Sequence, residues 1–206
     1  DTLPEVPARV GALLSGQVDI AWVLSPDDIP QLESAGMETV VTPLFDLVSF
    51  KFNTIPERTS VDNSPILDRR VRQAINYAIN REQYVSEVLG GFTVAAGQSG
   101  GRRTLGYQED IKPYPYDPDR AKRLLADAGY AEGLDLIMEL ITTSTDYTNT
   151  SQFVADNLKQ VGINLELRQI SLADLLGKLR GQKPWDGHMW MGLTESFPTG
   201  DVVRPF

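Results

Sequence analysis

Apolar residues along this chain recur at the spacings of helices and strands in alternation. One stretch, 68–79, carries them every three or four positions, as on one face of a helix: Val71, Ala74, Ile75, Ala78 and Ile79. Shorter apolar or alternating runs, typical of strands, lie at 18–24, 37–41, 44–53, 134–141, 163–170 and 186–193. The alternation of strands and helices along the chain predicts an α/β fold in which helices cover one mixed sheet.

The clearest helix boundary lies at Asp117. Pro113 and Pro115 hold the preceding chain extended, and Pro118 suits the first helical position because its missing N–H is not needed there. Asp117 is a typical N-cap, and Gly129 is suited to end the helix in the left-handed conformation. We predict a stiff lead-in to one packed helix.

Similar signals place the other helices. Cap pairs of a polar residue and an acid or amide three positions later are expected at Ser25 with Asp28, Asn80 with Gln83, and Ser171 with Asp174. Besides the helices at 68–79 and after Asp117, helices are predicted at 9–14, 80–89, 151–161 and after Ser171.

Composition narrows the classes of function. The 206 residues, 41% of them hydrophobic, can bury a substantial core, and the net charge of -9 with interspersed signs argues against nucleic acid or an anionic membrane surface as partner. The chain has no cysteine, which excludes disulfides and thiolate chemistry. It has no apolar run of membrane-spanning length. Because it begins at Asp1 and ends abruptly at Phe206, we expect a fragment of a longer protein.

Catalytic motifs are not evident. The single histidine, His188, excludes a multi-histidine metal site, and we favour a structural or pocket-lining imidazole over a catalytic one. The sequence has no GxSxG elbow and no phosphate-binding loop of the Walker type. We therefore predict neither an enzyme, nor a metal site, nor a cofactor.

Aromatic and acidic residues gather near the last predicted strand: Trp185, Trp190, Glu195, Phe197 and Asp201. Ligands of α/β sheets bind outside the carboxyl ends of strands, so this group is a candidate binding site. The alternative interpretation, with equal weight, is that both tryptophans belong to the core and that Glu195 is solvated.

Five motifs together resemble a known family: RVGALLSGQVDIAW, SFKFNT, DRRVRQAINYAINREQYVSEVLGG, GYQEDIKPYPYDPDRAKRLLADAGY and NLKQVGINLELRQIS. In this order they are similar to the extracellular solute-binding proteins, family 5, the dipeptide, oligopeptide and nickel class that serves ABC importers. The resemblance implies a lobe of the periplasmic binding protein type II-like fold, in a parent protein whose two lobes close over a ligand. Residues 1–43 would belong to the first lobe and hinge region. Residues 44–206 would form the carboxyl-terminal lobe, truncated before its return to the first.

The resemblance also indicates ligand contacts. Peptide-binding members carry an aspartate, in a pattern like W-x-x-D-Y-P-D-P, that pairs with the ligand's amino terminus. Counting forward from Trp185 places Glu195 at this position, and counting back from Phe197 places Ser196 there. Glu195 would anchor an ammonium group, whereas Ser196 would favour a neutral, hydroxyl-rich or anionic ligand.

Phe197, already named beside the last predicted strand, and four further residues complete the candidate set of ligand contacts. By resemblance, Trp190 offers an apolar face to a sugar or side chain, and Arg102 and Arg103 lie in a segment that approaches the cleft and would meet a carboxylate or phosphate. His188 is included as a pocket-lining residue.

The function implied by the resemblance is that of a non-enzymatic solute-binding component of an ABC importer. It would capture a peptide or similar small solute, pass it to membrane permease subunits, and work as a monomer in the periplasm or lipid-anchored at the cell surface. Two alternatives stay open. One is a sensor or chaperone with the receptor fold but no transport role. The other is a fragment of an α/β hydrolase or transferase, against which the absence of a nucleophile-and-base pair counts.

Overall fold

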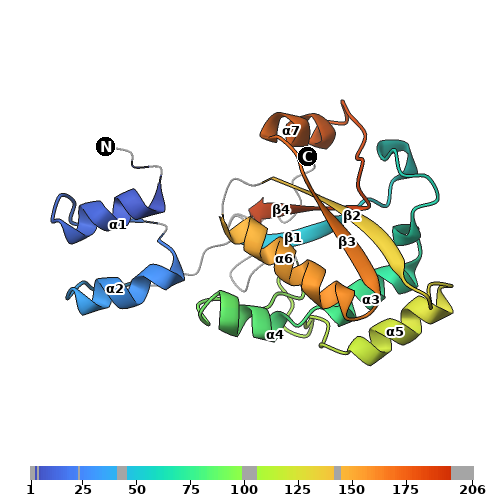
Figure 1. Ribbon diagram of the computed structural model, residues 1–206, viewed down its shortest axis with the longest axis horizontal. Coiled ribbons are helices and arrows are strands. Elements are labelled where there is room, and N and C mark those ends of the chain that lie inside the picture. The colour runs from blue at the N-terminus through green and yellow to red at the C-terminus, as the bar shows by residue number, and fades with distance from the viewer. Residues whose placement is uncertain are drawn as a thin grey trace. The chain divides into compact units, whose positions relative to one another are not determined.

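The computed structural model describes residues 3, 5–22, 24–40, 46–98, 106–141 and 145–195. The chain separates into two compact units: a small unit of residues 1–44 with 82–94, and a large unit of residues 45–81 with 95–206. Figure 1 shows the helices and strands of both units along the chain. Each unit is described by itself.

The regular elements described in the small unit are helical. It contains α1 (Val6–Leu14), a 3₁₀ turn (Pro26–Asp28), α2 (Ile29–Ser34) and the π-helical turn Tyr84–Val88, which follows the short α4 (Arg81–Gln83). The predicted cap at Ser25 is confirmed, because the Ser25 amide donates to the Asp28 carboxylate at 3.1 Å and the Asp27 amide donates to the Ser25 hydroxyl at 3.3 Å.

The strands predicted at 18–24 and 37–41 are wrong for the residues that the structure describes there. Residues 18–22, 24 and 37–40 adopt no strand conformation, although their composition suits one. A strand is stable only beside a hydrogen-bonded neighbour, and neither run pairs with another strand in the described part of the small unit. Ile20 and Trp22 are instead 71% and 77% exposed.

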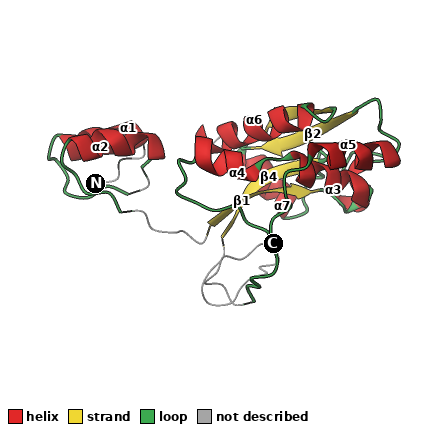
Figure 2. Cartoon of the chain, turned by 90° about the horizontal axis from the view of Figure 1, so that it is seen from below, coloured by secondary structure: helices red, strands yellow, loops and turns green. Residues whose placement is uncertain are grey.

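The large unit is built on one mixed sheet with the strand order β1-β4-β2-β3. The strands are β1 (Asp46–Phe52), β2 (Leu134–Leu140), β3 (Ile163–Gln169) and β4 (Met189–Glu195). β2 runs parallel to β3 and β4, and β1 is antiparallel to β4. The helices lie against both faces of this sheet (Figure 2), which confirms the predicted α/β class.

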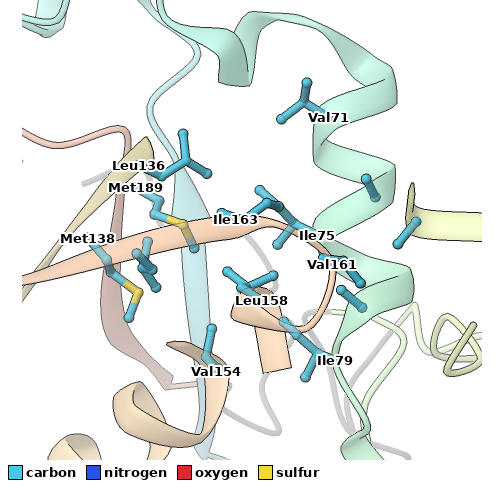
Figure 3. Close-up of a cluster of buried hydrophobic side chains, with 14 of the residues drawn as sticks. Val71, Ile75, Ile79, Leu136, Met138, Val154, Leu158, Val161, Ile163 and Met189 are labelled. Carbon is cyan, nitrogen blue, oxygen red and sulfur yellow. The ribbon is translucent and has the colours of Figure 1, made fainter. Parts of the chain in front are cut away.

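The main core lies on one face of the sheet, under α3 (Arg69–Ala78), α5 (Pro118–Asp127) and α6 (Thr145–Lys159). Figure 3 shows the apolar side chains of α3 and α6 meeting those of β2, β3 and β4. The prediction for α3 is confirmed, with Asp68 as the N-cap that accepts from the Arg70 amide at 2.8 Å. α6 begins at Thr145, earlier than the predicted Ser151. The prediction missed the first turns of this helix because their residues are mostly polar and show no apolar spacing.

The opposite face is covered by α7 (Leu172–Leu179). Leu175 packs there with Trp185 and Trp190 in a second, smaller cluster. The predicted cap of α7 is confirmed, since the Ser171 hydroxyl accepts from the Asp174 amide at 3.0 Å. We call this side of the sheet the α7 face.

The proline-rich lead-in to α5 is fastened to the end of α3. Tyr114 meets the Tyr77 ring edge-on at 4.9 Å between centroids, and the Asp117 amide donates to the Tyr77 carbonyl at 2.9 Å. The Asp117 carboxylate caps α5 by accepting from the Arg120 amide at 2.8 Å. With Gly129 at φ +94° after the helix, the predicted boundaries of this element are confirmed.

Candidate functional site

The seven candidate ligand contacts differ in what the structure shows of them. Trp190 and His188 are described in full, while Glu195 is the last residue of β4 and is described by its backbone. The other four lie outside the described residues: Arg102, Arg103, Ser196 and Phe197. The choice between Glu195 and Ser196 as the acidic anchor therefore stays a prediction.

His188 lies in the turn that leads into β4 and is mostly buried, with 9% of its surface exposed. Its backbone amide donates to the Ile137 carbonyl at 2.9 Å, and its Nδ1 accepts from the Ile137 amide at 3.0 Å. Burial lowers the pKa of His188 below its ordinary value, so the ring is neutral at physiological pH. An Nδ1 that accepts a hydrogen bond leaves the proton on Nε2. The imidazole thus helps to join this turn to β2.

Trp190 is packed into the α7 face. Its ring stacks on Trp185 with 4.8 Å between centroids and an interplanar angle of 14°. The Lys51 ammonium lies 4.5 Å from the centroid of the Trp190 ring, within range of a cation–π interaction. A Cβ atom at Gly192 would collide with the Trp190 ring, so glycine is required there for the indole to lie flat along the strand.

Next to this stack is a cavity of about 310 Å³, which we call the tryptophan cavity. Its lining includes Lys51, Asn53, Arg58, Leu179, Trp185 and Trp190. Arg58 is fixed at the end of α7, where its Nη2 donates to the carbonyls of Lys178 at 2.9 Å and Leu179 at 3.1 Å. These carbonyls belong to the helix C-terminus, which favours a cation.

A second cavity on the α7 face, of about 380 Å³, is lined by charged residues and is called the ionic cavity here. At its base Lys178 lies 3.0 Å from Glu139 and 2.6 Å from Asp186, and it donates to the Pro184 carbonyl at 2.8 Å. Glu139 is 1% exposed and also accepts from the amides of Asp186 and Gly187 at 3.1 and 3.2 Å. The network joins β2, α7 and the turn before β4.

The charged groups in this network stabilise one another in their ionised forms. Burial by itself lowers the pKa of Lys178, but hydrogen bonds to Asp186 and Glu139 outweigh it and leave the pKa raised. The hydrogen bond from Lys178 likewise lowers the pKa of Asp186. Because the Asp186 and Gly187 amides turn toward Glu139, regular pairing of β4 begins at Met189 rather than at the predicted Asp186.

Sequence reasoning missed Glu139, Lys178, Lys51 and Arg58. A signal was present for the first two, because Glu139 interrupts the apolar strand LDLIMEL and Lys178 interrupts the apolar helix LADLLGKL. A charge at a position that should be buried indicates a buried partner. Lys51 and Arg58 carried no such signal, since cations in a polar loop or an edge strand are common.

Neither a metal centre nor a membrane helix is found in the part of the chain that the structure describes. Those residues include no group of three or more histidine, aspartate or glutamate side chains placed to hold a metal ion. No described helix has the length and apolar character needed to cross a bilayer.

The sequence model of the bacterial extracellular solute-binding proteins, family 5 Middle, matches residues 1–203. The chain belongs to this family. The resemblance drawn from the five motifs is confirmed, and with it the expectation of a binding protein rather than an enzyme at the level of the family.

Curated relatives have names that refer to small peptides. The glutathione-binding protein GsiB of Shigella flexneri is 27% identical over 176 residues, which are 84% of this chain and 33% of that protein. Di/tripeptide-binding protein 2 of Pseudomonas aeruginosa is 29% identical over 189 residues, 89% of this chain and 34% of that protein. The chain therefore spans about a third of the length of these relatives.

A solved structure shows the same fold. The crystal structure of NikA from Brucella suis in complex with Fe(III)-EDTA superposes with a TM-score of 0.80 at 23% identity. The match covers 95% of this chain and 41% of that one. The predicted lobe of a periplasmic binding protein is confirmed as the fold.

Proposed function

We propose that this chain is part of the solute-binding component of an ABC importer, which captures a peptide or similar small solute between two lobes and delivers it to a permease. The observation that carries the proposal is the family match over residues 1–203. The names of the relatives, which refer to glutathione and to di- and tripeptides, favour a short peptide as the solute.

In this proposal residues 1–43 belong to the first lobe and hinge region, and residues 44–206 to the second lobe. A change of compact unit between residues 44 and 45 supports the boundary, with residues 82–94 grouped with the small unit. The complete protein would be a monomer in the periplasm or lipid-anchored at the cell surface, with permease subunits as its partners in the membrane.

The solute would meet the large unit at the carboxyl end of β4. β2, β3 and β4 are parallel, so their carboxyl ends share one edge of the sheet, where ligands of α/β folds bind. Glu195 is the last residue of β4, and Ser196 and Phe197 follow it in sequence. Arg102 and Arg103 remain candidate ligand contacts from the resemblance. Trp190 and His188 would contribute from buried positions in the large unit.

The test is to measure the thermal unfolding midpoint of the complete protein, with its full native sequence, in the presence of di- and tripeptides, glutathione, oligosaccharides and nickel chelates. A solute at about a thousand times its dissociation constant should stabilise the protein by about 4 kcal/mol. If Glu195 is the amine anchor, Glu195→Gln should abolish the shift with peptides and Ser196→Ala should not. A panel without any shift would refute solute capture and leave the sensor as the better account.

A further inference from the structure

The tryptophan cavity contains two cations that no acid among the described residues balances. Lys51 donates to the Ser49 hydroxyl at 3.1 Å and lies over the Trp190 ring. Arg58 donates through Nη2 to two carbonyls of α7. Among the described residues, no carboxylate forms an ion pair with either of them. On a chain with a net charge of -9, such a pair of unmatched cations is unexpected.

The ionic cavity on the same face shows the contrast. Lys178 lies there between two carboxylates, and Lys183 pairs with Asp174 at 2.5 Å. Arg168, which also lines it, pairs with Glu166 at 2.8 Å. Cations in the ionic cavity have carboxylate partners, whereas those of the tryptophan cavity have none in the part of the chain that the structure describes.

Lys51 also lies in a poor environment for an unmatched charge. Burial lowers the pKa of Lys51 below its ordinary value, because the ammonium loses water and gains no carboxylate in return. Arg58 also has unused hydrogen-bond donors, because both of its hydrogen bonds use Nη2 and neither Nε nor Nη1 bonds to a described residue. An anion in the cavity would supply what both groups lack.

The other residues that line the tryptophan cavity indicate the size and polarity of a ligand that would fit it. Trp185, Trp190 and Leu179 form the apolar part of the lining, where the stacked indoles are 5% and 9% exposed and Lys51 lies over the Trp190 ring. Asn53, which donates from Nδ2 to the Gly187 carbonyl at 2.7 Å, adds a polar edge. The volume of about 310 Å³ is at the small end of the range of roughly 300–1,000 Å³ for ligand pockets. A ligand that fits is small, with one anionic end and one flat apolar end.

We propose that the tryptophan cavity binds a small carboxylate with a flat apolar body, its carboxylate held by Lys51 and Arg58 and its body against the indole and leucine walls. A guanidinium and an ammonium together suit a carboxylate, because the guanidinium offers a planar set of donors and the ammonium a compact charge. The proposal does not rest on the transport function, since it concerns residues within the large unit alone.

The experiment is calorimetric titration of the complete protein with benzoate, and with benzamide as the uncharged probe of the same shape. Benzoate should bind saturably, and benzamide at least about tenfold more weakly, as expected for loss of a charge-assisted hydrogen bond. Lys51→Met keeps an unbranched apolar stem without the ammonium and should weaken benzoate binding at least about tenfold. Lys122→Met removes the same charge from an exposed position on α5 and should leave the affinity unchanged.

Circular dichroism confirms that each variant is folded, and Lys51→Arg, which keeps the charge, should retain binding if Lys51→Met loses stability. The proposal is overturned if benzoate shows only heats of dilution, if benzamide binds as well as benzoate, or if Lys51→Met and Lys122→Met bind benzoate alike. Retained binding in Lys51→Met would assign the anion to another surface of the protein.

Discussion

Replacing Lys178 with methionine should cost this protein more stability than any surface charge does. The change removes the only cation that forms an ion pair with Glu139 among the described residues. The Glu139 carboxylate, 1% exposed, is then held by two backbone amides. Breaking a buried ion pair by removing one partner costs about 3–5 kcal/mol. Asp186 adds little to this sum, because its side chain is 53% exposed and water screens such a pair to about 0–1 kcal/mol.

The assay is urea and thermal unfolding followed by tryptophan fluorescence, since Trp185 and Trp190 lie beside the network. A loss of about 3 kcal/mol should lower the midpoint by roughly 6–12 °C. Lys183→Met is the matched control: it removes the same group from the same cavity, but at a position where the side chain is 57% exposed, so the midpoint should hardly move. Adding Glu139→Gln to Lys178→Met should restore part of the loss, because the buried charge is then gone as well. Equal midpoints for Lys178→Met and Lys183→Met would refute the reasoning.

Three other predictions concern stability. Gly192→Ala should lose about 1–3 kcal/mol in urea unfolding, because its Cβ meets the Trp190 ring; Gly11→Ala, where the space is open within α1, is the control and should lose nothing, and a tolerated Gly192→Ala would contradict the packing described. Asp117→Ala should lose about 0.5–2 kcal/mol with the N-cap of α5, and unchanged unfolding would show that the proline-rich lead-in suffices alone. The raised pKa of Lys178 contributes stability that is fully present below its ordinary value of 10.5 and is lost as pH rises through the folded value, so the wild type should weaken in alkaline unfolding titrations by a component that Lys178→Met lacks.

Features that depend on neighbours in sequence were the predictable ones. The caps at Asp117 and Ser171 each satisfy an amide three residues away, so local sequence predicts them. The apolar stripe of α3 was predictable for the same reason, because residues three or four positions apart in sequence lie on one face of a helix.

Features that depend on distant partners were missed or wrong. The run 18–24 has the composition of a strand, but a strand needs a neighbour that its own residues do not specify. Glu139 meets the Asp186 amide 47 residues further on, a pairing that no local pattern shows. Trp190 illustrates a third case: its residue type indicated an aromatic surface, and only the fold shows that the ring stacks on Trp185 beside a cavity.

The central claim, capture of a solute between two lobes, is tested most directly by small-angle X-ray scattering of the complete protein with and without a saturating solute. The solute is the compound that gives the largest thermal stabilisation in the panel of peptides, glutathione, oligosaccharides and nickel chelates. Closure of two lobes predicts a smaller radius of gyration in the bound state. A radius that does not change at saturation would contradict capture by lobe closure.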